Sequence, residues 1–105
     1  MAAVHLNADT FRQLLQNEKP ALVEFWAPWC GHCRDLEGAF NQIAEEYADR
    51  LSFGKINIDD FPELTAKYYI EYVPTLVIFS EGDLIDFVIS PGSKDAIAQF
   101  IEESL

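Results

Sequence analysis

The sequence predicts one α/β domain in which a mixed β-sheet lies between helices. Apolar side chains recur along its 105 residues with a period that changes regularly between two and about 3.6. A near-continuous apolar run at residues 21–26 is typical of a strand covered on both faces. Apolar runs at residues 75–80 and 84–90 are joined by Glu81-Gly82-Asp83 and indicate an antiparallel hairpin. Since no linker or repeat divides the chain, we expect residues 1–105 to form a single domain.

The first half of the chain predicts alternating strands and helices. The expected bounds of these β-α-β-α-β elements are residues 4–6, 9–17, 21–26, 30–48 and 51–58. Asn7 or Asp9 would cap the first helix. Gly38 interrupts the second helix at a cost of roughly 1 kcal/mol relative to alanine, so we expect a bend there.

The second half continues as α-β-β-α. Residues 60–63 open a short helix with a cap, a proline in the first turn and a capping-box glutamate. The hairpin follows, and Ser93 caps a final helix whose Ile97, Phe100 and Ile101 face the core.

The charge balance and the lack of targeting signals narrow the classes of partner. Eighteen acidic residues against seven basic ones give a formal charge of −11, which argues against binding to nucleic acid or an anionic membrane. The N-terminal residues lack the basic and apolar regions of a signal peptide, and no segment reaches the ~20 apolar residues of a membrane span. We therefore expect a cytoplasmic protein, most simply a monomer.

The chemistry-bearing motif is Cys30-Gly31-His32-Cys33, placed directly after the buried strand and at the start of the long helix. Residues three apart share one helix face, so the two sulfurs can approach bonding distance. The free N–H groups and the positive end of the helix favour a thiolate at Cys30. Cys33, one turn further in, is the resolving thiol. A C-x-x-C in a β-α-β pattern indicates a redox pair.

A zinc site is the alternative for these cysteines. It would need about four ligands, and beyond the pair only His5 and His32 are plausible. We therefore expect no metal.

The sequence resembles the thioredoxin family over essentially the whole chain. The resemblance rests on Phe25-Trp26-Ala27-Pro28-Trp29-Cys30-Gly31-His32-Cys33, on Lys55 before Asn57-Ile58-Asp59, and on Val73-Pro74-Thr75. The inner Gly31-His32 pair departs from the typical Gly-Pro and is similar to protein disulfide isomerase domains. The resemblance implies a thioredoxin fold, disulfide-containing protein substrates, a donor similar to thioredoxin reductase, and no bound cofactor.

Glu24 is the one acid in the buried run, and two interpretations are open for it. It is either an exposed carboxylate on a sheet edge or a buried one whose raised pKa lets it take a proton from Cys33. The resemblance implies the second role. Lys55 either pairs with Glu24 or is a surface lysine.

Several further residues are candidates for the site. His32 either is solvated or stabilises the Cys30 thiolate and so makes the disulfide more oxidising. Trp26 and Trp29 are either core aromatics or aromatics at the rim of the site. Trp29 is also a candidate for covering the disulfide and contacting substrates, and Gly31 is a further candidate for contacting substrates. The resemblance implies that Pro74 is a cis-proline opposite the disulfide, where the Val73 backbone pairs with an extended substrate.

Three segments depart from the family pattern and bear on partner choice. Gly38 stands where a kinking proline is usual, Ser90-Pro91 replaces a glycine-containing loop, and residues 69–72 lack the usual glycines and basic residue. With Asp35 and Glu37 nearby, the rim of the site is either acidic enough to disfavour acidic partners or merely solvated.

We therefore predict a thiol–disulfide oxidoreductase, most simply a thioredoxin-like reductase of protein disulfides. An oxidase or isomerase is the alternative that His32 favours. A non-catalytic binding or subunit module on the same fold is an alternative from another class.

Overall fold

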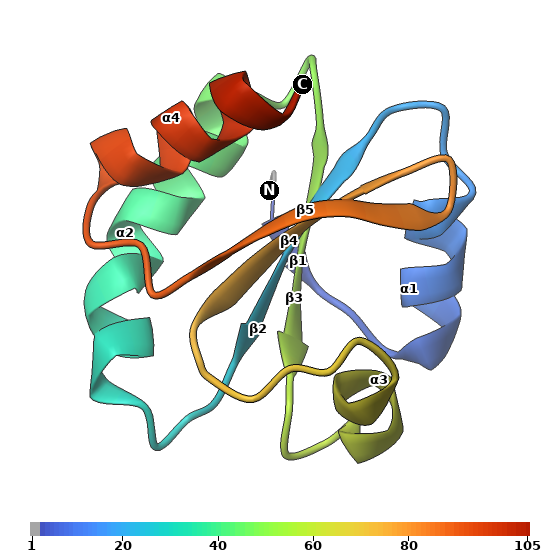
Figure 1. Ribbon diagram of the computed structural model, residues 1–105, viewed down its shortest axis with the longest axis vertical. Helices are drawn as coiled ribbons and strands as arrows, with labels where there is room; N and C mark the ends of the chain where they lie inside the picture. Colours follow the sequence, from blue (N-terminus) through green and yellow to red (C-terminus); the bar gives the residue numbers. More distant parts are fainter. Residues whose placement is uncertain (1–2) are drawn as a thin grey trace.

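The computed structural model describes residues 3–105 and shows a five-stranded sheet between two pairs of helices (Figure 1). The elements in chain order are β1 (Ala3–His5), α1 (Ala8–Leu15), β2 (Ala21–Trp26), α2 (Gly31–Glu46), β3 (Ser52–Asn57), α3 (Pro62–Lys67), β4 (Thr75–Ser80), β5 (Asp83–Ile89) and α4 (Lys94–Ser104). The predicted element order and mixed sheet are confirmed.

The sheet has the spatial order β1-β3-β2-β4-β5, which places β2 at its centre. β1 and β2 run parallel to β3, whereas β4 runs antiparallel to β2 and to β5. Because β4 is antiparallel to β2, it begins at the edge of the sheet where β2 ends, and Phe25 of β2 lies opposite Thr75 of β4. This register brings the segment before β4 next to the segment after β2.

Successive side chains of the central strands enter two separate apolar cores. One core lies under α2 and α4, and the other lies under α1 and α3. Leu22 enters the first and Val23 the second, and both are completely buried. The near-continuous apolar run of β2 is therefore explained by cover on both faces.

The helix ends mostly follow their predicted caps. The Asn7 side chain accepts the Thr10 backbone N–H at 2.8 Å, and the Ser93 hydroxyl accepts that of Ala96 at 3.1 Å. Helix α1 ends two residues earlier than predicted, because Gln16 and Asn17 donate to carbonyls three residues back rather than four. Helix α2 begins at Gly31 and runs through Gly38 without interruption.

The predicted cap of α3 is wrong. The helix begins at Pro62, as the first-turn proline indicated, but its N-cap is Phe61 and no side chain of residues 3–105 caps it. Asp60 lies one residue too early, in a turn where its N–H donates to the Asn57 carbonyl at 3.1 Å. Glu63 therefore does not complete a capping box.

The hairpin between β4 and β5 is confirmed, and it turns through Glu81 and Gly82. Both residues have positive φ, 54° and 86°, as a tight two-residue hairpin turn requires. None of the helices described in residues 3–105 is long and apolar enough to cross a membrane.

Two glycines make a matched test of packing. A Cβ at Gly54 of β3 would collide with the buried Leu6 side chain, lying 2.8 Å from its Cγ, whereas no atom of the described residues outside the local helix lies within 4 Å of a Cβ at Gly38. We expect Gly54→Ala to lower the free energy of unfolding by about 1–3 kcal/mol. We expect Gly38→Ala to raise it by about 0.5–1 kcal/mol, because alanine favours the helix.

Urea unfolding of the oxidised protein measures both changes. The loss of stability caused by Gly54→Ala should be smaller when it is measured in a Leu6→Ala background, since the collision is then removed. An unchanged stability of Gly54→Ala would contradict this account of the β3 packing.

Candidate active site

The two cysteines form a disulfide at the point where β2 passes into α2. Cys30 is the N-cap residue of α2 and Cys33 lies in its first turn, with 5.3 Å between their Cα atoms. The Cys33 backbone N–H donates to Cys30 Sγ at 3.1 Å. Cys30 is 8% exposed and Cys33 4%. The spacing argument is confirmed: the sulfurs share one helix face, and Cys30 occupies the positive end of the helix.

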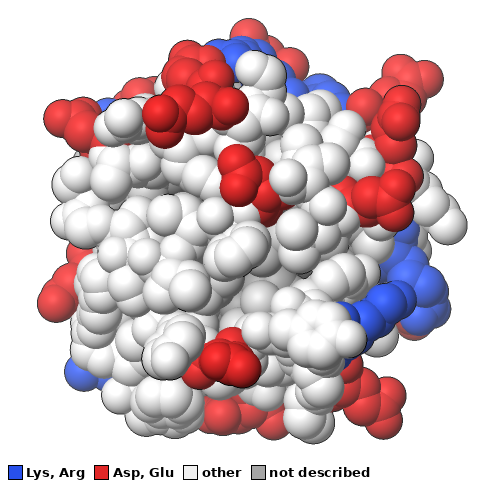
Figure 2. All heavy atoms as spheres, in the orientation of Figure 1, with Lys and Arg blue, Asp and Glu red and all other residues white. Residues whose placement is uncertain are grey.

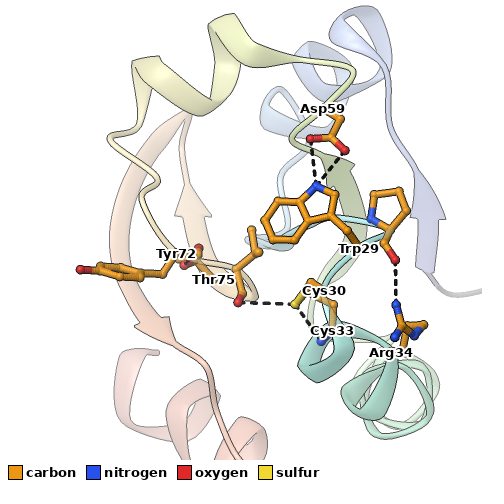
Figure 3. The surroundings of a disulfide bond; sticks show 9 residues. Trp29, Cys30, Cys33, Arg34, Asp59, Tyr72 and Thr75 are labelled. Carbon is orange, nitrogen blue, oxygen red and sulfur yellow. Dashed lines mark hydrogen bonds between the residues drawn. A yellow bond between two sulfur atoms is a disulfide. The ribbon is translucent and has the colours of Figure 1, made fainter.

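The loop before β4 lies directly against this disulfide (Figure 3). The Val73 carbonyl oxygen is 3.6 Å from Cys30 Sγ, and the peptide bond between Val73 and Pro74 is cis. The Thr75 hydroxyl donates to the Tyr72 carbonyl at 2.6 Å and closes the loop. The cis-proline that the resemblance implied is therefore present and lies beside the disulfide.

The Ser90 backbone holds the same loop from the other side. Its N–H donates to the Pro74 carbonyl at 2.8 Å, and its φ is +49°. Sequence reasoning singled out Ser90 as a departure but missed this bond, because only the antiparallel pairing of β4 and β5 brings the two residues together.

The two tryptophans have different positions around the cysteines. Trp29 is 65% exposed at the rim, and its indole N–H donates to the two Asp59 carboxylate oxygens at 3.1 and 3.3 Å (Figure 3). Trp26 is half-buried and packs against the cluster formed by Ala27, Cys30 and Cys33. Asp59 was not among the predicted site residues, and its place after β3 was the one available signal, since parallel strands end at the same sheet edge.

Arg34 makes a second contact that the sequence did not predict. Its guanidinium donates to the Pro28 carbonyl at 2.8 Å and ties the first turn of α2 to the loop that precedes Cys30 (Figure 3). Gly31 and His32 lie between the cysteines and are exposed.

Glu24 is buried in the centre of the sheet, so the exposed-edge interpretation is wrong. Its side chain is on the central strand β2, the residue is 2% exposed, and its Oε2 has no hydrogen-bond partner among the described residues. Burial raises its pKa from an ordinary 4.5 to about 7, and the Glu37 carboxylate adds to this rise. Lys55 opposes the shift by favouring the charged form.

Lys55 is neither a surface lysine nor the ion-pair partner of Glu24. Lys55 is 7% exposed and therefore no surface lysine, and its ammonium makes no ion pair with Glu24 in the described structure. It lies 3.9 Å from Glu37 Oε1 and over the Phe40 ring, 5.6 Å from the centroid. Glu24 and Lys55 are register partners on β2 and β3, but α2 supplies the carboxylate that the ammonium approaches.

A small cavity connects the buried acid with the second cysteine. Its volume is about 120 Å³, and its lining includes Glu24, Cys33, Trp26, Lys55 and Glu37. A carboxyl group whose pKa is about 7 can accept or release a proton at neutral pH. The arrangement therefore offers proton exchange next to Cys33.

Comparison with known proteins agrees with this geometry. The thioredoxin family model matches residues 2–103. "Thioredoxin 1" of Nostoc sp. is 37% identical over 105 residues, covering 99% of this chain and 98% of that protein. "Thioredoxin" of Pyropia yezoensis is 39% identical over 104 residues, covering 98% and 97%.

The chain belongs to the thioredoxin family. It has the thioredoxin fold and is a thioredoxin-type thiol–disulfide oxidoreductase whose redox-active pair is Cys30 and Cys33. The alternative of a non-catalytic module on this fold is not supported. Within residues 3–105, no group of three or more His, Cys, Asp or Glu side chains is arranged to hold a metal ion.

The buried Glu24 makes the stability of the fold depend on pH. Folded Glu24 keeps its proton up to about pH 7, whereas the unfolded chain loses it near pH 4.5. Stability conferred by this group is therefore complete below pH 4.5 and is lost as pH rises through about 7. We expect the loss to total roughly 3 kcal/mol.

The isosteric Glu24→Gln variant, which cannot titrate, is the reference for this loss. Urea unfolding of the two oxidised proteins between pH 4 and pH 9 measures the difference. The free energy of unfolding of the variant should rise relative to that of the parent between about pH 4.5 and 7. Above pH 7 the difference should stay constant. Parallel profiles for the two proteins would show that Glu24 does not titrate with a raised pKa.

Proposed function

We propose that Cys30 is the nucleophile that reduces disulfides of protein substrates. Its thiolate attacks one sulfur of the substrate disulfide, so that a mixed disulfide forms and the other substrate sulfur leaves as a thiolate. The Cys33 thiolate then attacks Cys30 Sγ, forming the Cys30–Cys33 disulfide and releasing the second substrate thiol. The observation that supports these roles is the position of Cys30 at the N-terminus of α2, with the Cys33 N–H directed at its sulfur.

Glu24 is the proton acceptor for Cys33 in this proposal. Cys33 must lose a proton before it can attack the mixed disulfide, and Glu24 shares a cavity with it. The pKa of about 7 allows the carboxylate to take that proton at neutral pH. Lys55 and Trp26 act as supporting residues, because both line the same cavity.

The substrate binds across the rim formed by Trp29, Gly31, Val73 and Pro74. The Val73 carbonyl beside Cys30 Sγ accepts a hydrogen bond from an extended substrate segment, which reads backbone rather than sequence. A reductase similar to thioredoxin reductase returns the disulfide to the dithiol. A single domain over residues 1–105, a monomeric state and a cytoplasmic location stay predictions.

Substitution of each cysteine tests the assigned roles. We expect Cys30→Ser to abolish reduction of the insulin disulfides, because the nucleophile is lost. We expect Cys33→Ser to trap a mixed disulfide, because the resolving thiol is lost, and mass spectrometry of the quenched reaction detects that adduct.

Glu24→Gln should form the mixed disulfide at the parental rate and release it more slowly, most visibly below neutral pH. Full multiple-turnover activity in Cys33→Ser would reverse the assignment of the two sulfurs. Equal release rates in Glu24→Gln and the parent would remove Glu24 from the mechanism.

An oxidase or isomerase is the second candidate, and the position of His32 favours it. His32 is exposed in the first turn of α2, where a positive charge or an N–H donor near Cys30 stabilises the thiolate and therefore the reduced form. A more stable reduced form makes the disulfide a stronger oxidant.

We expect His32→Pro to shift the reduction potential to more negative values by roughly 30 mV or more, which is ~1.4 kcal/mol for two electrons. The fold should tolerate proline there, because a first-turn N–H has no partner within the helix. Equilibration with glutathione measures the potential, and Arg34→Lys, which keeps the positive charge two residues after His32, is the control. An unchanged potential in His32→Pro would identify His32 as a solvated residue and would weaken the second candidate.

A further inference from the structure

An apolar groove lies beside the redox centre, between β5 and the segment that joins α3 to β4. Its volume is about 470 Å³. We call it the β5 groove, and define it by Tyr69, Glu71, Tyr72, Leu84, Phe87 and Ile89. Figure 2 shows the face that carries β5: uncharged surface covers most of it, acidic side chains stand singly, and Lys and Arg side chains lie towards its margin.

The groove exists because β5 is the edge strand on the side of the sheet that α1 and α3 cover. Phe87 lies opposite Val77, and Leu84 lies opposite Phe79. Val77 and Phe79 belong to the core under α1 and α3, but the side chains of β5 extend past it. Phe87 is therefore 54% exposed, although it points to the same face as buried neighbours.

Two exposed tyrosines line the opposite wall, and one of them, Tyr69, adopts an unfavourable backbone conformation. Tyr69 is 88% exposed and adopts a φ of +56°, a left-handed conformation that is unfavourable for a residue with a Cβ. Tyr72 is 60% exposed. Glycine would relieve the backbone at position 69, so the tyrosine is not explained by folding. Contiguous exposed apolar surface of this kind marks an interaction site.

One end of the β5 groove is the loop that contacts the disulfide. Tyr72 precedes Val73, whose carbonyl lies 3.6 Å from Cys30 Sγ. At the same end, Ile89 is opposite Thr75, and the Ser90 N–H is bonded to the Pro74 carbonyl. A polypeptide joined to Cys30 through a mixed disulfide therefore has the groove as a direct continuation of its binding surface.

We propose that the β5 groove binds the segment flanking the reactive cysteine of the protein substrate, and that it selects apolar or aromatic side chains accompanied by a basic one. This inference rests on the proposed function, because it names the substrate class of the same site. Along β5, the distance from Ile89 to Leu84 matches roughly five residues of extended chain, as their pairing with Thr75 and Phe79 of β4 indicates. Glu71 is the one charged residue among the described residues that line the groove.

Charge complementarity supports this occupant. The chain carries a formal charge of −11, and Glu71 is exposed at the groove. A basic side chain next to the apolar ones would approach this carboxylate, whereas an acidic segment would be repelled.

The test uses three short peptides, each carrying one cysteine in a mixed disulfide with glutathione. Their flanks are aromatic and basic, aromatic and acidic, or composed of glycine and serine. Stopped-flow tryptophan fluorescence measures the second-order rate constant of the reduced protein with each peptide and with a small synthetic disulfide that has no flanking peptide. We expect the aromatic and basic peptide to react at least tenfold faster than the glycine and serine peptide, a difference of ~1.4 kcal/mol.

Variants of the groove should remove this preference without removing the chemistry. We expect Tyr69→Gly combined with Phe87→Thr to bring the two rate constants within twofold, and Glu71→Gln to abolish the advantage of basic over acidic flanks. Ile85→Thr is the matched control, because Ile85 is 46% exposed on the same strand but does not line the groove. It should keep the full preference, and all variants should reduce the small disulfide at the parental rate.

Three results would overturn the proposal. Equal rate constants for all peptides in the parent, with normal reduction of the small disulfide, would show that the groove is not used and would leave the proposed function intact. Failure of the parent to reduce the small disulfide would refute the proposed function and the inference with it. Concentration-dependent dimerisation in sedimentation experiments, lost in Phe87→Thr, would identify a second copy of the chain as the occupant.

Discussion

The contact between the cis-proline loop and the N-terminus of α2 is the constraint on which the active site depends. It follows from the antiparallel alignment of β4 with the central strand β2, which places the start of one strand beside the end of the other. The result is a distance of 3.6 Å between the Val73 carbonyl and Cys30 Sγ. The cis-proline loop and the β5 groove reach the redox centre through this junction, so a shift in the β2–β4 register would separate both from the disulfide.

In the proposed mechanism, the cost of burying Glu24 serves the chemistry. A carboxyl group in an apolar strand whose Oε2 finds no hydrogen-bond partner within residues 3–105 is unfavourable to bury, particularly in its charged form. The same burial is what raises its pKa to about 7. The approach of Lys55 to Glu37, rather than to Glu24, leaves that rise only partly opposed. A direct Glu24–Lys55 ion pair would stabilise the charged carboxylate and lower its pKa, which would make the carboxylate a weaker base at neutral pH.

Chemistry and partner choice occupy adjoining but separate parts of the molecule. The cysteines, Glu24 and Lys55 lie at the ends and centre of the strands that the two cores enclose, where packing holds them in place. The β5 groove lies at the sheet edge, where side chains are exposed and a substitution changes the surface without disturbing a core. An exposed Tyr69 or Phe87 can therefore alter which segment binds beside the disulfide while the exchange reaction stays the same.

The sequence by itself determined the element order, the mixed sheet and the disulfide. Each of these depends on short-range features: apolar periodicity, cap residues and a cysteine spacing of three. For Glu24 the sequence left an exposed and a buried position open, and the central place of β2 in the sheet decided for burial. Tertiary structure alone decided that Lys55 approaches Glu37, that Asp59 binds Trp29, and that Ser90 holds Pro74. It also left α3 without a capping side chain from the described part of the chain, and it opened the β5 groove. The physical reason is that these contacts join residues far apart in the chain, so they depend on strand register and helix placement, which local patterns do not encode.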